Sequence, residues 1–74
     1  MPTLIRPIGM LKDYIGGRVE AEVAPGQTVR EALVVLKIPP EIVALVMVNG
    51  DQQTKDYCLQ DGDLVRVMAV IGGG

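Results

Sequence analysis

One stretch of the sequence has the helical period, and segments with strand character lie on both sides of it. Thr28 stands three residues before Glu31, the spacing of a capping box, in which both side chains accept a backbone N–H. Four apolar residues follow at i, i+3, i+4 and i+7, as on one face of a helix: Val29, Ala32, Leu33 and Leu36. Pro39-Pro40 predicts the end of this helix, because proline cannot donate a hydrogen bond to it.

Two strands are predicted before the helix. Residues 4–8 are apolar and β-favouring, with Pro7 near the end, which is typical of a short strand at or near a sheet edge. Residues 18–23 alternate strictly, and one face of this strand is expected to be buried: Val19, Ala21 and Val23. In the connector 9–17, one helical turn is expected before Gly16-Gly17 ends it.

Three strands are predicted after the helix. Residues 44–48 form a continuous apolar run, as expected of a central strand. Asn49-Gly50 is a strong hairpin signal, because both residues tolerate positive φ. Residues 52–59 are polar and predict a brief edge strand and a loop. Asp61-Gly62-Asp63 is a turn signature before the last strand, residues 64–69. The two aspartates could also be metal ligands, but the pattern favours a turn.

This order of elements predicts an α+β fold with one helix packed across a mixed sheet, the β-grasp or ubiquitin-like arrangement. Its first and last strands are expected to be parallel in the centre of the sheet. A chain of 74 residues is too short to divide into two cores, so residues 1–74 are predicted to form a single domain. Residues 70–74 are expected to be a flexible C-terminal tail that carries the functional carboxylate.

Composition excludes several classes of function. The formal charge is −2 and the seven basic residues are scattered, so no nucleic-acid partner is expected. No signal peptide or bilayer-length apolar run is present, so we expect a cytoplasmic protein that does not bind membranes. With one cysteine and no histidine, a zinc site is not expected. Cys58 is expected to be a plain, partly buried loop residue, since no basic cluster lies beside it in the sequence.

Three internal stretches and the end of the chain resemble the MoaD/ThiS family of sulfur carriers. Chains of this family close with a hydrophobic residue, a small residue and Gly-Gly, and Ile71-Gly72-Gly73-Gly74 matches this register. The resemblance covers essentially the whole chain. The internal stretches are Pro25-Gly26-Gln27-Thr28-Val29-Arg30-Glu31-Ala32-Leu33, Val48-Asn49-Gly50 and Leu59-Gln60-Asp61-Gly62-Asp63-Leu64-Val65.

The sequence offers no general acid/base pair or nucleophile, so the chain is expected not to be an enzyme by itself, and the resemblance implies a protein co-substrate. A ubiquitin-activating-type adenylyltransferase would consume ATP to join Gly74 to AMP, and a sulfurtransferase would then supply sulfur to give a thiocarboxylate. The recipient would be a synthase subunit that makes molybdopterin or the thiazole of thiamin. The chain would bind no cofactor of its own. It could also be a small non-catalytic subunit of such a synthase complex.

The last glycines also have a physical explanation. A chain end that enters a narrow tunnel is favoured by the absence of Cβ atoms, so Gly72 and Gly73 are expected to thread Gly74 into a partner's active site. The alternative is that the three glycines are an ordinary frayed terminus.

A partner surface is predicted on the sheet face away from the helix. If Val46, Val48, Val65 and Val67 point to the helix, then the residues between them point outward and form an apolar patch with a basic centre. The alternatives are that loops cover this face or that the register differs by one residue. The predicted partner-binding residues are Leu45, Met47, Leu64, Arg66 and Met68, with Ile71 at the end of the last strand.

Two other functions are compatible with these features. A ubiquitin-like modifier would use the same activated Gly74 to form isopeptide bonds with lysines. A β-grasp binding or regulatory module would carry the glycine tail incidentally.

Overall fold

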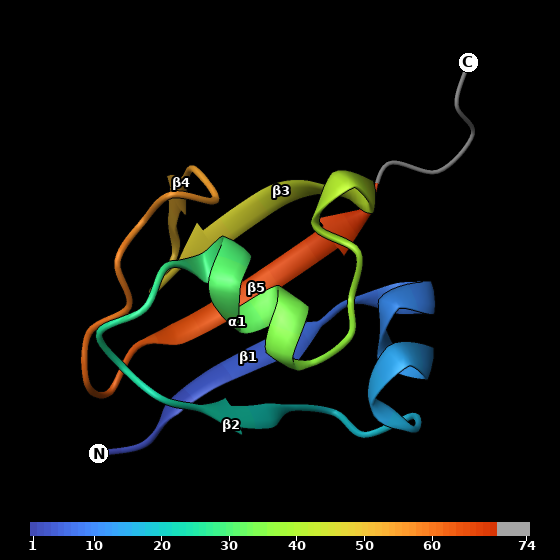
Figure 1. Ribbon diagram of the computed structural model, residues 1–74, viewed down its shortest axis with the longest axis horizontal. Helices are drawn as coiled ribbons and strands as arrows, with labels where there is room; N and C mark the ends of the chain where they lie inside the picture. Colours follow the sequence, from blue (N-terminus) through green and yellow to red (C-terminus); the bar gives the residue numbers. More distant parts are fainter. Residues whose placement is uncertain (70–74) are drawn as a thin grey trace.

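A computed structural model describes residues 1–69 of the chain. In this range five strands form one sheet in the order β2-β1-β5-β3-β4, and α1 lies across one face of it (Figure 1). This arrangement confirms the predicted α+β β-grasp fold. The strands are β1 (Thr3–Pro7), β2 (Ala21–Val23), β3 (Val43–Val48), β4 (Asp51–Gln53) and β5 (Leu64–Ala69). The helices are α1 (Val29–Val35) and the 3-10 helices η1 (Gly9–Ile15) and η2 (Pro40–Ile42).

The centre of the sheet is the predicted parallel pair. β1 pairs with β5 in parallel, from Leu4 opposite Leu64 to Pro7 opposite Val67. β3 continues the sheet antiparallel to β5, and the short strands β2 and β4 form its two edges. The first strand therefore lies next to an edge, as Pro7 indicated. In this arrangement β1 and β5 end at the same side of the sheet (Figure 1).

The start of α1 is fixed by the predicted capping box. The hydroxyl of Thr28 accepts from the backbone N–H of Glu31 at 3.1 Å, and the Glu31 carboxylate accepts from the backbone N–H of Thr28 at 2.8 Å. The predicted apolar face of this helix packs into the core. Val29, Ala32 and Leu33 are buried there, and Leu36 packs against them at the C-cap.

The end of α1 differs from the prediction, because the helix stops before the two prolines. Lys37 adopts a left-handed φ of 63°. The N–H of Ile38 donates to the carbonyl of Leu33 at 2.9 Å, and that of Lys37 donates to Val34 at 3.0 Å, which is a Schellman motif. This reversal brings Ile38 into the core, where it is 1% exposed. Pro40 instead opens the short helix η2.

The second strand is shorter than predicted, since it begins at Ala21 and not at residue 18. Val19, predicted to be on the buried face, is 62% exposed. The antiparallel ladder with β1 stops at the pair Ile5–Ala21. Continued by two residues, it would place Val19 opposite Pro7, which has no N–H to extend the ladder.

The left-handed Lys37 gives a test of this account of the helix end. Lys37→Gly should raise the free energy of unfolding by about 0.5–1 kcal/mol, because glycine adopts positive φ without a Cβ penalty. Urea denaturation at neutral pH would measure this. Lys37→Ala, which removes the charge and keeps Cβ, is the matched control and should not be stabilised. Equal stability of the two variants would mean that Lys37 carries no backbone strain.

Candidate functional site

The candidate site begins where β5 leaves the sheet. Ala69, the last residue of this strand, pairs with Val43 at the start of β3. The helices η1 and η2 lie at this same end of the molecule (Figure 1). The functional residues predicted beyond this point lie outside the described residues, so their roles stay predictions. These are Ile71, expected to contact a partner, and Gly72, Gly73 and Gly74, expected to carry the chemistry.

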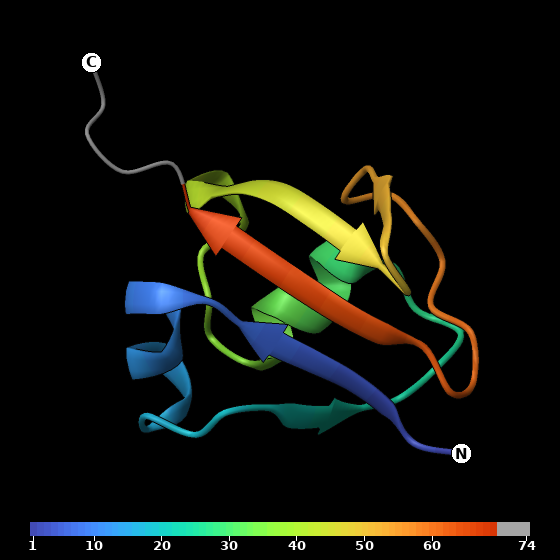
Figure 2. The same cartoon turned by 180° about the vertical axis from the view of Figure 1, so that it is seen from behind.

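No helix among residues 1–69 covers the face of the sheet opposite α1 (Figure 2). The residues predicted to point outward on this face do so. Its predicted residues are half-buried or exposed, and the residues that alternate with them are buried beneath α1. The alternative of a register one residue away is therefore excluded. The outward residues are Leu45, Met47, Leu64 and Met68, all half-buried, and Arg66, which is exposed; the buried ones are Val46, Val48, Val65 and Val67.

Strand pairing brings these outward residues together in rows across the sheet. Met68 pairs with Leu45 in one apolar row, and Leu64 pairs with Leu4 in another. Between them, Arg66 pairs with Met47 on one side. We call this surface, from β1 to β3, the outer face.

Arg66 also pairs with Arg6 on β1, so two arginines lie side by side in the middle of the outer face. Arg6 donates to the carboxylate of Glu20 at 2.9 Å, whereas Arg66 makes no ion pair with any other residue in 1–69. The sequence reasoning missed Arg6 and Leu4, although both alternate with the buried Ile5. Their place on this surface follows only from the parallel register with β5.

At the other end of β5, a buried carboxylate organises the turn. Asp63 accepts from the hydroxyl of Tyr57 at 2.9 Å, from the N–H of Gln60 at 2.9 Å and from the side-chain amide of Asn49 at 2.8 Å. Asn49 in turn accepts from the N–H of Leu64 at 2.9 Å and donates its own N–H to the carbonyl of Leu64. The β3–β4 turn and the start of β5 are thereby joined.

These hydrogen bonds set the charge state of Asp63. Burial alone would raise the pKa of its carboxyl, but the bonds from Gln60, Tyr57 and Asn49 outweigh burial and lower the pKa below its ordinary value. The same contact, with the negative charge of Asp63, raises the pKa of the Tyr57 hydroxyl. The role of Asp63 is thus structural, in agreement with the turn predicted for Asp61-Gly62-Asp63.

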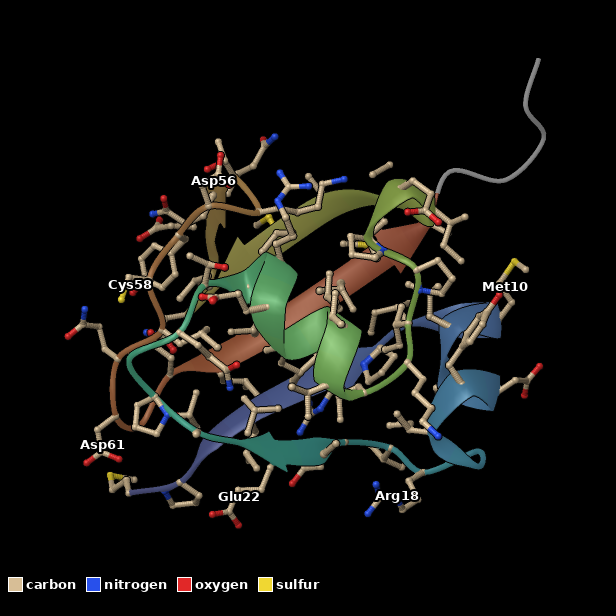
Figure 3. The ribbon with its side chains drawn as sticks, in the orientation of Figure 1. Met10, Arg18, Glu22, Asp56, Cys58 and Asp61 are labelled. Carbon is tan, nitrogen blue, oxygen red and sulfur yellow. The ribbon has the colours of Figure 1, made fainter. Side chains whose placement is uncertain are left out.

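Cys58 is exposed, and the prediction that it is partly buried was wrong. Its neighbour Leu59 is buried and Tyr57 packs against the core, so the alternation of the chain turns Cys58 outward. It lies in the loop after β4, at the other end of the molecule from the end of β5 (Figure 3). Within residues 1–69 no group of three or more His, Cys, Asp or Glu side chains could hold a metal ion.

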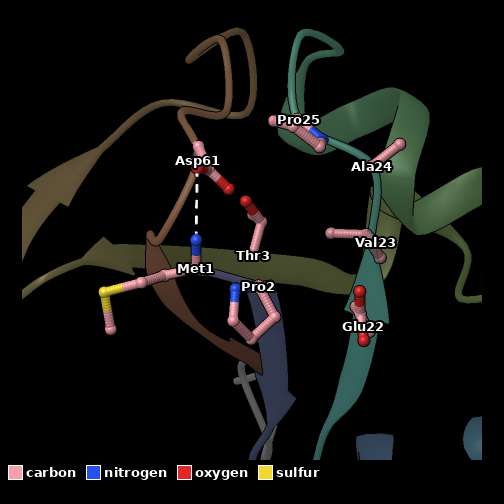
Figure 4. Close-up of a pocket in the computed structure, with 8 residues that line it drawn as sticks. All are labelled: Met1, Pro2, Thr3, Glu22, Val23, Ala24, Pro25 and Asp61. Carbon is pink, nitrogen blue, oxygen red and sulfur yellow. Dashed lines mark hydrogen bonds and ion pairs between the residues drawn. The ribbon is translucent and has the colours of Figure 1, made fainter.

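An open hollow of about 710 Å³ lies beside the N-terminus, between β1, β2 and the turn before β5 (Figure 4). The N-terminal amine and the carboxylate of Asp61 form an ion pair at 3.2 Å across one side of it. Because β1 and β5 run parallel, this hollow lies at the opposite end of the sheet from Ala69. It is therefore separate from the end at which β5 leaves the sheet.

Comparison with known families identifies the chain. The model of the ThiS family matches residues 8–74. The chain belongs to the ThiS family. It is thus a member of the MoaD/ThiS group of small ubiquitin-like sulfur carrier proteins, which in general work with activating enzymes and synthase subunits. None of the helices in residues 1–69 has the length and apolarity that crossing a membrane requires.

Solved structures show the same fold at low sequence identity. Urm1 from Trypanosoma brucei has a TM-score of 0.68 and 20% identity, over 99% of this chain and 95% of that chain. A protein named molybdopterin converting factor, subunit 1, from Pyrococcus furiosus also has a TM-score of 0.68 and 20% identity, over 96% of this chain and 99% of that chain. SAMP1 from Haloferax volcanii has a TM-score of 0.67 and 19% identity, over the full length of both chains. A comparison with curated protein sequences finds no match.

The network around Asp63 predicts a pH-dependent contribution to the stability of this ThiS-family protein. Because the pKa of Asp63 is lowered in the folded state, its stabilisation is complete about one pH unit above the unfolded pKa, near pH 5, and is lost as the pH falls through the folded pKa. Asp63→Asn should lower the free energy of unfolding by about 2 kcal/mol at pH 7, and by less at pH 3. Urea denaturation at both pH values would measure this.

The matched control is Asp61→Asn, in the same turn but with an exposed side chain, and it should change stability little. If Asp63→Asn were as stable as the unmodified protein at pH 7, the network would not hold the start of β5 in place.

Proposed function

We propose that this ThiS-family protein carries sulfur as a thiocarboxylate on Gly74. The observation that supports this most is the extent of the family match, which runs through Ile71-Gly72-Gly73-Gly74 to the last residue. The position of β5 agrees with it, since this strand is central in the sheet and the chain continues from its end. A firmly held strand is a suitable base for a segment that an enzyme must bind.

The chemistry proceeds in two displacements, both carried out by partners. In the first, the carboxylate oxygen of Gly74 attacks the α-phosphate of ATP in a ubiquitin-activating-type adenylyltransferase, and pyrophosphate leaves. In the second, sulfide-level sulfur attacks the acyl carbon, and AMP leaves with one of the original carboxylate oxygens. When the sulfurtransferase delivers this sulfur as a persulfide, a thiol reductant supplies the two electrons that release it as the thiocarboxylate. The activation is needed because a carboxylate is a poor electrophile. ATP is consumed by the activating enzyme, so the carrier itself needs no cofactor.

Gly72 and Gly73 have the threading role in this proposal, because residues without Cβ occupy the narrowest path to an active site. The acceptor of the sulfur is a synthase subunit that makes molybdopterin or the thiazole of thiamin. We place these reactions in the cytoplasm, where sulfur donors are kept reduced.

We further propose that the outer face, together with Ile71, is where the activating enzyme binds. Supporting this are the solvent-facing Leu45, Leu64, Met47 and Met68, since flexible methionine-rich surfaces adapt to more than one partner. Arg66 gives this surface a charged centre. The outer face and the end of β5 belong to the same strand, so one enzyme can contact both.

The proposed chemistry predicts a change in mass. After incubation with the activating enzyme of the same organism, ATP and a sulfide source, the intact mass should rise by about 16 Da, the exchange of one oxygen for sulfur. A protein that lacks Gly73-Gly74 should show no rise, with its thermal midpoint unchanged. No rise with the full chain would contradict the proposal and favour a binding module. A ladder of masses on other proteins would instead identify a modifier.

If the outer face binds the activating enzyme, replacing one of its apolar residues should weaken binding more than it lowers stability. Met47→Gln should weaken binding of the activating enzyme about tenfold, because it places an amide in an apolar contact, and should change stability little. Calorimetric titration and thermal unfolding would measure the two effects. The matched control is Val34→Gln on α1, where the side chain is 61% exposed on the other side of the molecule. Equal binding by the two variants would remove Met47 from the partner surface.

A further inference from the structure

The two arginines in the middle of the outer face are paired in the parallel ladder between β1 and β5. Side chains at directly paired positions on one face are neighbours, and like charges placed there destabilise a sheet. Arg6 and Arg66 thus lie close together at a cost to the isolated carrier. A partner that supplies a negative charge at this position would offset this cost in a complex.

Within residues 1–69, the positive charge at this position is only partly neutralised. Glu20 accepts from Nη2 of Arg6 at 2.9 Å, and Nε of Arg6 is buried without a hydrogen-bond partner. Arg66 is exposed and makes no ion pair in that range. The carboxylates of Glu20 and Glu22 lie on the β2 side, beside Arg6 and opposite Leu4, so of the two guanidinium groups the one without a paired carboxylate among residues 1–69 is that of Arg66.

The surroundings of the arginines indicate which anion fits. The apolar pairs Leu4–Leu64 and Leu45–Met68 lie on either side of them, and Met47 lies next to Arg66. Two cations are too few for a nucleic-acid site, which must displace several counterions. Arginine surrounded by leucine and methionine is instead typical of the centre of a protein–protein interface, where it binds a carboxylate with two parallel hydrogen bonds.

We propose that Arg66, with Arg6 beside it, receives an aspartate or glutamate side chain from the activating enzyme when the outer face docks. Glu20 holds Arg6 in place and offsets its charge, so Arg66 is the guanidinium open to the incoming carboxylate. This ion pair fixes the orientation of the carrier on the enzyme, since the apolar contacts around it are not directional. The inference rests on the proposed function, because it concerns the enzyme that activates Gly74.

The test is a pyrophosphate-exchange assay with the activating enzyme of the same organism and the full-length carrier as the varied substrate. Arg66→Glu should raise the KM for the carrier by about tenfold or more and leave kcat unchanged at saturation, because the ion pair acts in docking. Arg66→Gln should have a smaller effect in the same direction. For the unmodified carrier KM should rise with salt, and for Arg66→Glu this rise should be absent.

Arg30→Glu is the matched control, since it reverses an exposed charge on α1, on the other side of the sheet, and its KM should stay within about twofold of the unmodified protein. Thermal midpoints of both Arg66 variants should not fall, because each removes repulsion from Arg6. If the Arg66 variants match Arg30→Glu in KM, the inference is wrong and the proposed function stands. If the unmodified carrier supports no exchange at all, the proposed function fails, and the inference fails with it.

Discussion

The parallel pairing of β1 with β5 is the constraint on which the rest of the structure depends. It joins residues 3–7 to residues 64–69, almost the full length of the chain apart. Parallel strands cannot be connected by a tight turn, so the intervening chain must cross over, and α1 covers one face of the sheet as it does so. The same pairing leaves the other face open and brings Arg6 beside Arg66.

The two ends of β5 have different tasks. At its start, the buried carboxylate of Asp63 is satisfied by three donors and fixes the strand to the neighbouring turn. At its end, about 17 Å away for a strand of this length, Ala69 pairs with Val43 and the chain continues to the glycines. Contacts that stabilise the fold are thereby separated from the segment proposed to react. This separation lets the last residues be selected for threading, without loss of core packing.

Most of the fold could be predicted from the sequence because its signals are local: the capping box at Thr28, the Asn49-Gly50 turn and the alternation of the strands. The misses arose where distant contacts override local patterns. Lys37 adopts its left-handed conformation because Ile38 must reach the core, and the second strand is cut short opposite Pro7. For the candidate site, the outward side of β3 and β5 could be predicted from alternation. Arg6 could not, because its position requires the register of a pairing between opposite ends of the chain.

The central claim is that a stable, unreactive body presents Gly74 to enzymes that modify its carboxylate. The most direct measurement is mass spectrometry of the protein isolated from the cells that produce it. Trypsin cleaves after Arg66, so the peptide of residues 67–74 contains the whole tail. The account predicts that a fraction of this peptide ends at Gly74 with sulfur in place of one carboxylate oxygen. A peptide that continues past Gly74, or that carries only an ordinary carboxylate while the acceptor pathway is active, would contradict it.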